Sequence, residues 1–291
     1  MKGIILAGGS GTRLYPLTKT ISKQLLPIYD KPLIYHPLST LMLADIREIL
    51  IITNPENVKL FINLLGDGSQ LGLNISYQVQ LHPKGIPEAF LIGEKFINND
   101  NVCLILGDNI FHSDMFINQY FVPSLKTGTP TIFGYHVDNP ERYGVIEFDK
   151  KKKVLSVEEK PRFPKSNYVI TGLYIFDKEA SYIAKKLSPS DRGETEIVDM
   201  IKYYLNKKEL NVKLLGRGVT WLDTGTHKSL QEASSYVEVL ENRQGLKIAC
   251  IEEIAFYKGY ITKDQLLNIA HPLKKNDYGK YLIKIAMSEI K

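Results

Sequence analysis

A glycine-rich stretch near the start of the chain is the first candidate for chemistry. Residues 8–13 read Gly-Gly-Ser-Gly-Thr-Arg and follow the apolar run 3–7, which predicts a buried strand. At the carboxyl end of a parallel strand, the backbone N–H groups of such a turn can bind a phosphate because no side chain blocks the approach. Leu14 replaces the third glycine of the dinucleotide-binding fingerprint, and the Gly-Lys-Ser/Thr of a P-loop is missing. The stretch therefore predicts a phosphate site of another kind with Arg13 as its positive charge, or else a structural turn.

Three further charged residues could complete a site for a nucleoside triphosphate. Lys23 lies ten residues after Arg13, and a basic pair suits this chemistry because negative charge concentrates on the α-phosphate and the leaving pyrophosphate. Asp108 and Asp223 each come directly after or close behind a predicted strand. Carboxylates in that position can hold Mg²⁺ together with phosphate oxygens. Taken singly, Lys23 could be a surface charge, and either aspartate could be a helix N-cap or turn residue.

An acid and a base stand side by side at Glu159 and Lys160, ahead of Pro161, which favours extended backbone or a turn. Glu159 could accept hydrogen bonds from sugar hydroxyls while Lys160 binds a phosphate. Without further context, an exposed salt-bridged pair is the simpler interpretation. Gly144 and Gly172 lie in neighbouring predicted strands, where a missing side chain would let a sugar approach the backbone.

Composition excludes several other classes of protein. The chain has 291 residues, 44% of them hydrophobic and 24% charged, and its formal net charge of +5 does not favour nucleic-acid binding. Cys103 and Cys250 stand alone in apolar strings, so neither a disulfide framework nor a zinc site is expected. No histidine pair has metal-ligand spacing, and no Gly-x-Ser-x-Gly motif is present. No apolar run approaches the ~20 residues that span a bilayer, so we expect a cytoplasmic protein without a membrane partner.

The elements that must position these residues alternate in the first half of the chain. Short apolar runs predict buried strands, and the stretches between them, each with a proline in the first turn, predict helices. This alternation indicates an α/β fold with a mainly parallel sheet covered on both faces. The predicted strands are 3–7, 48–53, 75–80 and 102–107, and the predicted helices are 32–43, 55–65 and 87–97.

After about residue 130 the pattern changes to strands with few helices, which predicts an antiparallel or mixed extension of the sheet. Helices are predicted at 194–204 and 227–240, and the last forty or so residues, 252–290, read as short helices that form a cap or an oligomer surface. The four lysines 150–153 are expected in a solvated hairpin turn. The predicted strands here are 131–137, 143–148, 154–158, 168–176, 212–215 and 219–221.

Taken together, the motifs resemble those of the sugar-1-phosphate nucleotidyltransferases. The stretch 8–14 with Pro16, and Ser-Lys-Gln-Leu-Leu-Pro at 22–27, resemble the family signature. Further motifs narrow the resemblance to the branch whose members transfer a thymidylyl group from dTTP to glucose 1-phosphate, and the resemblance covers essentially the whole chain. These motifs lie at 106–109, 141–145, 158–161, 171–174, 192–194, 221–226 and 241–247.

The resemblance implies a Rossmann-like nucleotidyltransferase fold with a catalytic domain over residues 1–243. Its nucleotide-binding half would be about 1–130 and its sugar-binding part about 131–226, while the helical segment 244–291 would pack on the same domain or at an oligomer interface. Members of this branch make dTDP-glucose and pyrophosphate with Mg²⁺ as the cofactor. The product feeds dTDP-rhamnose and related deoxysugars, among them those of the lipopolysaccharide O-antigen. Such enzymes are usually homotetramers.

The resemblance also implies roles for individual residues. Arg13, Lys23, Asp108, Lys160 and Asp223 would be catalytic, and Asp108 and Asp223 would hold Mg²⁺. An amide at Gln80 would pair equally well with thymine or uracil. The nucleotide would contact Gly8, Gly9, Ser10, Gly11, Thr12, Arg13, Lys23, Gln24, Gln80 and Gly85. Glucose 1-phosphate would contact Asn109, Tyr143, Gly144, Glu159, Lys160 and Ile170.

Two stretches depart from the family pattern. The usual Gly-Leu-Ala-Gln-Ala beside the base site reads Gly-Ile-Pro-Glu-Ala at 85–89, so Pro87 removes a backbone donor and Glu88 adds a charge. Aromatic and glycine residues often follow Leu-Gly-Asp-Asn in the family, but Ile-Phe-His-Ser follows here at 110–113. That region is implicated in a second, regulatory nucleotide site, to which Arg217 would belong.

Two alternative functions remain open at this stage. A sibling enzyme that uses UTP or another sugar phosphate would keep the phosphate turn and the aspartates, so only the residues around Gln80 and Gly144 discriminate. A non-catalytic sensor of nucleotides or sugar nucleotides would be expected to have lost Arg13, Lys23 or one of the two aspartates, and all four residues are present.

Overall fold

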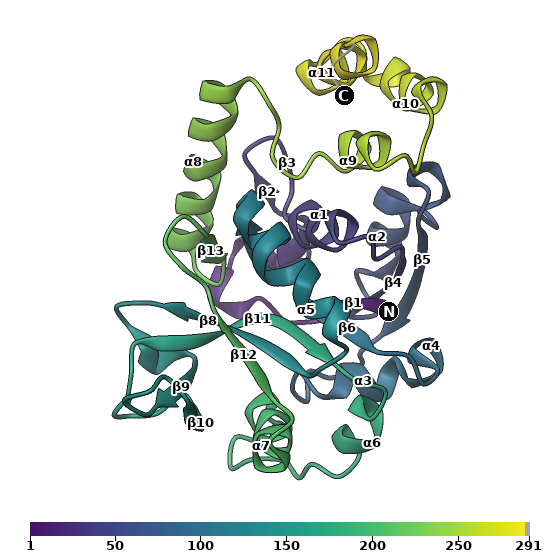
Figure 1. The fold of residues 1–291 in the computed structure, drawn as a ribbon. Helices are drawn as coiled ribbons and strands as arrows, with labels where there is room; N and C mark the ends of the chain where they lie inside the picture. The colour runs from purple at the N-terminus through teal and green to yellow at the C-terminus, as the bar shows by residue number, and fades with distance from the viewer. Residues whose placement is uncertain (289–291) are drawn as a thin grey trace.

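The computed structural model describes residues 1–288, whose centre is a nine-stranded sheet (Figure 1). Two small antiparallel pairs, β2 with β3 and β7 with β13, lie apart from this sheet. The strands are β1 (Lys2–Ala7), β2 (Pro27–Ile28), β3 (Lys31–Pro32), β4 (Glu48–Thr53), β5 (Asn74–Val79), β6 (Val102–Leu106), β7 (Asn109–His112), β8 (Thr131–His136), β9 (Gly144–Phe148), β10 (Val154–Glu159), β11 (Tyr168–Phe176), β12 (Asn211–Leu214) and β13 (Thr220–Asp223).

The sheet has a parallel half and a mostly antiparallel half, in which β12 pairs in parallel with β8. β1 pairs in parallel with both β4 and β6, and β4 pairs in parallel with β5. β11 then runs antiparallel to β6, β8 and β9, and β10 adds antiparallel to β9. The predicted parallel sheet with an antiparallel or mixed extension is confirmed, because the change of direction falls where the sequence pattern changes.

Helices cover both faces of the sheet and extend beyond it at one end. In Figure 1 the last three helices gather at the top, far from the β9–β10 hairpin. The helices are α1 (Tyr35–Leu43), α2 (Val58–Leu65), α3 (Glu88–Ile92), α4 (Glu94–Ile97), the π-helical turn η5 (Phe116–Phe121), α5 (Val122–Thr127), α6 (Ala180–Ala184), α7 (Ile197–Lys207), α8 (His227–Gln244), α9 (Ile251–Tyr257), α10 (Lys263–Ala270) and α11 (Asp277–Met287). Short 3₁₀ turns lie at Thr12–Leu14, Leu17–Lys19, Lys23–Leu25, Ser69–Leu71, Pro140–Arg142 and His271–Leu273.

Alternation along the strands builds a separate core on each face of the sheet. Ile5 and Ile51 point into one cluster, together with α1 and α9, whereas Ile4 and Ile52 point into the other, together with α3 and α7. The central strands are buried on both faces, which is why their sequences read as continuous apolar runs. A third, smaller cluster joins β2, β7 and α8.

Two predicted helices begin later than expected, after Pro32 and after Pro55, and a third is interrupted at Gly93. Pro32 belongs to β3, and the helix begins three residues later at Tyr35. Residues 55–57 form a turn, so α2 begins at Val58. The predicted helix 87–97 is divided at Gly93 because this residue lies against the sheet, where a Cβ would come within 3.1 Å of Ile4 Cδ1.

The predictions for the two cysteines and for the lysine-rich turn are confirmed. Cys103 and Cys250 are buried free thiols. The backbone N–H groups of Lys151 and Lys153 donate to Asp149 Oδ1, both at 2.8 Å, in the turn between β9 and β10. Within residues 1–288, no helix combines the length and the apolar character that a bilayer crossing requires. The last residues of the predicted tail, 289–291, lie outside the described part of the chain.

Candidate active site

A cavity of about 600 Å³ lies between the two halves of the sheet. One wall comes from the carboxyl ends of β1 and β6, and the opposite wall comes from β9, the end of β10 and β11. The loop 192–196 and the start of α7 complete the lining. Open α/β sheets bind ligands at the carboxyl ends of their strands, which is where this cavity opens.

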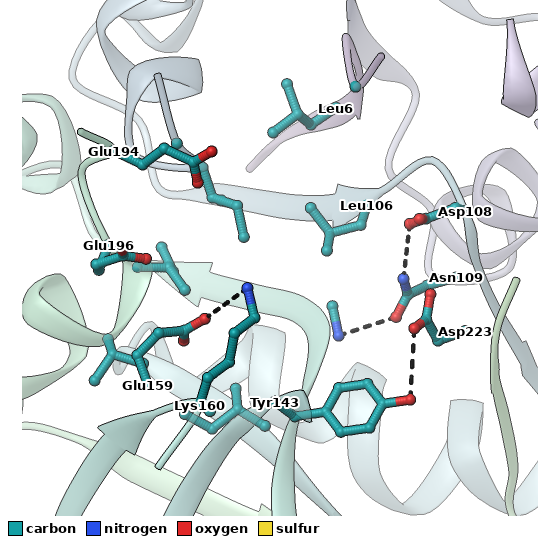
Figure 2. A pocket seen from close by; sticks show the side chains of 18 of the residues that line it. Leu6, Leu106, Asp108, Asn109, Tyr143, Glu159, Lys160, Glu194, Glu196 and Asp223 are labelled. Atoms are coloured by element: carbon teal, nitrogen blue, oxygen red, sulfur yellow. Dashed lines mark hydrogen bonds and ion pairs between the residues drawn. The ribbon is translucent and has the colours of Figure 1, made fainter. Parts of the chain in front are cut away.

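The β7–β13 pair brings the two candidate metal-binding aspartates to the same place. Asp223 on β13 is in register with Asn109 on β7, which directly follows Asp108. Thr224 anchors this end of the pair by donating from its N–H and its hydroxyl to the Asp108 carbonyl, at 3.2 and 2.9 Å. Figure 2 shows Asp108 and Asp223 together on one side of the cavity, across from Glu159 and Lys160.

The two carboxylates have opposite electrostatic environments. Asp108 forms an ion pair with the buried Lys23. Burial alone would raise the pKa of Asp108, but the charge and hydrogen bond of Lys23 outweigh it, so this pKa lies below its ordinary value. Burial and the nearby Asp108 raise the pKa of Asp223 above its ordinary value. Asp223 is therefore a carboxylate that lacks sufficient compensating positive charge.

This donor set fits a divalent cation. The described residues contain no cluster of three or more His, Cys, Asp or Glu side chains suited to a metal, so protein ligands here are limited to the Asp108 and Asp223 carboxylates. Mg²⁺ typically takes one or two carboxylates and completes its shell with water and substrate phosphates. The unneutralised charge on Asp223 is what such a cation would balance.

The predicted phosphate turn lies at the edge of the cavity, and part of it lines the wall. Gly9 and Arg13 face the cavity, whereas Gly8, Ser10, Gly11 and Thr12 do not line it. Gly11 has φ 63°, a conformation that favours glycine, and its carbonyl accepts from Thr18 Oγ1 at 2.7 Å. A Cβ on Gly225 would lie 3.2 Å from both Arg13 Nη2 and Asp223 Oδ1, so this glycine leaves room for the arginine beside the aspartate.

The predicted base-binding residues are only partly brought together. Gln80 and Gly85 line the cavity, and a Cβ on Gly8 would collide with Gln80 Oε1, so Gly8 makes room for this amide. Gln24 does not line the cavity; it is buried, and its Oε1 accepts from Ser22 Oγ at 2.6 Å. Lys23 also lies outside the lining and reaches the site through Asp108.

The predicted sugar-phosphate residues all line the cavity, and Asn109 is fixed most firmly. Its Oδ1 accepts from Trp221 Nε1 at 2.6 Å and from Gly172 N–H at 3.0 Å, while its Nδ2 donates to Asp108 Oδ1 at 2.9 Å. A side chain at 172 could not fit, because its Cβ would lie 2.5 Å from Asn109 Oδ1. The amide of Asn109 therefore has one orientation, and Tyr143, Gly144, Glu159, Lys160 and Ile170 complete this predicted set.

Charged side chains from the end of β10 and from the loop 192–196 meet at one side of the cavity. Lys160 Nζ lies 3.4 Å from Glu159 Oε1, and the Arg192 guanidinium lies 3.3 Å from the same oxygen. Arg192 also pairs with Glu196 at 2.7 Å. Lys160 has φ 44°, a left-handed conformation that is uncommon for a lysine, and this places its side chain at the cavity wall.

Six further charged or aromatic residues line the cavity, and none of them has a role among the predicted site residues. They are Arg142, Tyr174, Arg192, Glu194, Glu196 and Trp221. All except Glu196 lie inside motifs that carry the family resemblance, such as 141–145 and 192–194, so the sequence contains a signal for them. Glu196 lies outside those motifs, and no sequence signal identifies it.

A second cavity, of about 510 Å³, lies between β7, α1 and α9. Phe111, His112 and Ser113 line it, which are residues of the predicted regulatory region, whereas Arg217 does not. The regulatory role of this region stays a prediction.

The chain belongs to the nucleotidyl transferase family, whose model matches residues 2–239. A curated relative from Neisseria meningitidis, named glucose-1-phosphate thymidylyltransferase, is 55% identical over 98% of this chain and 99% of its own length. A crystal structure from Bacillus anthracis, provisionally assigned as a glucose-1-phosphate thymidylyltransferase and solved with sucrose, is 42% identical with a TM-score of 0.74, over 81% of this chain and 94% of its own. A UDP-glucose pyrophosphorylase bound to UDP-glucose is 26% identical with a TM-score of 0.72, over 82% and 98%. The resemblance drawn from the motifs is confirmed, and the chain is a nucleotidyltransferase enzyme.

Proposed function

We propose that this enzyme converts dTTP and α-D-glucose 1-phosphate into dTDP-α-D-glucose and pyrophosphate. The observation that supports this most strongly is that one cavity is lined by both aspartates, by Glu159 and Lys160, and by the amide of Gln80. The relatives named glucose-1-phosphate thymidylyltransferase support the same activity over nearly the full length of the chain. The product would supply dTDP-rhamnose or related dTDP-deoxysugars.

The sugar phosphate is the nucleophile in this reaction. Its phosphate oxygen, held by Lys160, attacks the α-phosphorus in line; a new P–O bond forms there, and the bond to the bridging oxygen of the β-phosphate breaks. The electron pair leaves with pyrophosphate. No covalent enzyme intermediate and no strong general base are needed, because the nucleophile is already an anion. Catalysis is then alignment together with charge neutralisation by Arg13 and Lys23.

The remaining residues of the cavity orient the two substrates. Glu159 and Asn109 would hydrogen-bond the sugar hydroxyls, and Gln80 would pair with the edge of the base; all three line the cavity. Asp108 and Asp223 would hold Mg²⁺, which when bound screens charge on the phosphates. Until substrate arrives, Asp108 keeps Lys23 in place through their ion pair.

The first experiment measures pyrophosphate release by the purified enzyme with glucose 1-phosphate and Mg²⁺, comparing dTTP with UTP, ATP, CTP and GTP. We expect the fastest release with dTTP. Release with UTP but little with dTTP would keep the mechanism and assign the sibling activity, which the structural likeness to a UDP-glucose pyrophosphorylase makes the second candidate. Absence of release with every triphosphate would contradict the proposal and favour a sensor.

Three further properties stay predictions under this proposal. They are the homotetramer, the cytoplasmic location, and the division into a catalytic domain over 1–243 and a tail over 244–291. Light scattering on the purified chain, whose mass is 33.1 kDa, would count the subunits directly.

A further inference from the structure

The side-chain amide of Gln80, which is predicted to pair with the base, forms a hydrogen bond that the family resemblance does not predict. Gln80 Nε2 donates to Glu88 Oε2 at 2.6 Å, and the backbone N–H of Lys84 donates to the same oxygen at 3.1 Å. Glu88 is half-buried at the start of α3 and does not line the cavity. Gln80 itself is only 3% exposed.

We propose that Glu88 is a positioning residue that fixes the Gln80 amide in one orientation and thereby selects thymine or uracil over cytosine. This inference rests on the proposed function, because it concerns the base that the same cavity binds. Glu88 does not touch the nucleotide; it acts through Gln80.

The chemistry of a carboxylate explains why the Gln80 amide cannot rotate by about 180° to exchange its oxygen and nitrogen. An ionised carboxylate only accepts hydrogen bonds, so the Gln80 side facing Glu88 must be its NH₂ group. A flipped amide would place the Gln80 oxygen against a carboxylate oxygen at about hydrogen-bond distance, which is repulsive. The Gln80 oxygen is therefore held on the other side, above Gly8, where the glycine leaves space for it.

The orientation of this amide decides which pyrimidine it can pair with. Thymine and uracil present the O4 acceptor beside the N3–H donor, whereas cytosine presents an amino donor beside a ring-nitrogen acceptor. A glutamine that turns over freely can match either pattern, since its two ends exchange donor and acceptor. A glutamine held in one orientation matches only one of these two patterns, which under the proposed function is the pattern of thymine and uracil.

Glu88 is itself held in place by a hydrogen bond from the backbone of the preceding loop. The Lys84 N–H that donates to it belongs to a loop whose Lys84 carbonyl accepts from Thr195 N–H at 2.8 Å and Thr195 Oγ1 at 2.9 Å. Gly85 makes this approach possible, because its φ is 107° and a Cβ there would collide with the Thr195 carbonyl. The orientation of Gln80 is thus tied to the loop 192–196, which lines the same cavity.

The test compares E88A with E88Q and measures kcat/KM for dTTP, UTP and dCTP with glucose 1-phosphate. E88A leaves the amide free, so we expect the dTTP-to-dCTP ratio to fall about tenfold, mainly through KM, with UTP following dTTP. E88Q still offers an acceptor oxygen, oriented by the Lys84 N–H, and we expect its ratio to stay within about threefold of wild type. E94A is the control, because Glu94 is an exposed residue of α4 paired with Lys185.

Each outcome decides for or against the role of Glu88. An unchanged ratio in E88A, or the same loss in E88Q as in E88A, overturns it. If E88A melts far below wild type, E88M fills the volume without an acceptor and carries the same expectation. Calorimetric titration of dTTP and dCTP without the sugar phosphate reads the same selectivity without turnover, so a failure of the proposed reaction and a failure of this inference are told apart.

Discussion

Among single residues, Asp108 and Asp223 differ in how their charge affects the stability of the fold. Asp108 neutralises the buried Lys23, whereas Asp223 adds a charge that burial and Asp108 both disfavour. Removing one partner of a buried ion pair costs about 3–5 kcal/mol, because the other charge is left uncompensated. Removing a carboxylate with a raised pKa carries no such cost.

We therefore expect D108N and D223N to behave alike in catalysis and differently in stability. Both should lower pyrophosphate release by about 100-fold or more, since each would lose a Mg²⁺ ligand. Without Mg²⁺, D108N should melt well below wild type and D223N at or above it. Mg²⁺ should raise the melting temperature of wild type alone. Equal melting temperatures for the two variants would contradict this account of the Lys23 ion pair.

His36 predicts a pH dependence of stability that is independent of the active site. Burial, followed by the charge of Lys31, lowers the pKa of His36 to about 3, and its Nε2 has no hydrogen-bond partner within residues 1–288. The unfolded chain binds this proton below its ordinary pKa of about 6.5, so unfolding takes up a proton between the two values. Stability should accordingly fall as the pH drops through this window, by about 1.4 kcal/mol at pH 5.5.

Denaturant unfolding at pH 7.5 and pH 5.5 tests this in H36Q. The variant should lose about 1.4 kcal/mol less than wild type between the two pH values, whatever its stability at pH 7.5. H82Q is the matched control, since His82 is an exposed histidine. A slope in H36Q equal to that of wild type would show that His36 is not held neutral in the folded chain.

At the scale of elements, local patterns found the sheet but not the pair that positions the carboxylates. Residues 48–53 and 168–176 form strands with the predicted bounds, because each is a buried apolar run. β7 was not predicted: it is only four residues long, and its partner β13 lies more than 100 residues away in the chain. No local signal records such a pairing, since non-local contacts determine it.

The individual site residues divide in the same way. Asp108, Glu159 and Lys160 follow strands whose positions can be read from the sequence, and all three line the cavity. Gln24 belongs to a family motif, but the fold turns its side chain into the interior, where Ser22 meets it. Glu88 could be seen only as a departure from the family pattern; its contact with Gln80 required the structure.

At the scale of the whole molecule, the last helices are part of the core rather than an appendage. Ile251, Leu266 and Leu282 are buried in the same cluster as Ile5 and Ile51 of the central sheet. α9 lies against α1, and Tyr260 on the following loop donates from its hydroxyl to the Met42 carbonyl at 2.9 Å. The side chains of Lys31 and Glu241 add a buried ion pair at 2.7 Å beneath the connection to this tail.

A chain that ends at residue 243 should for this reason fail to fold cooperatively, even though the family match itself ends at 239. Each fully buried leucine or isoleucine contributes about 1.5–3 kcal/mol, and the tail buries several of them, against a total stability of about 5–15 kcal/mol for an ordinary domain. Removing the tail would also expose the apolar face of α1. Thermal unfolding and size-exclusion chromatography of the 1–243 chain should show aggregation or a broad, non-cooperative transition. A chain ending at residue 288, which keeps every contact described here, is the control. A monodisperse, active 1–243 chain with a sharp transition would instead make the tail a separable unit that folds on an already stable catalytic domain.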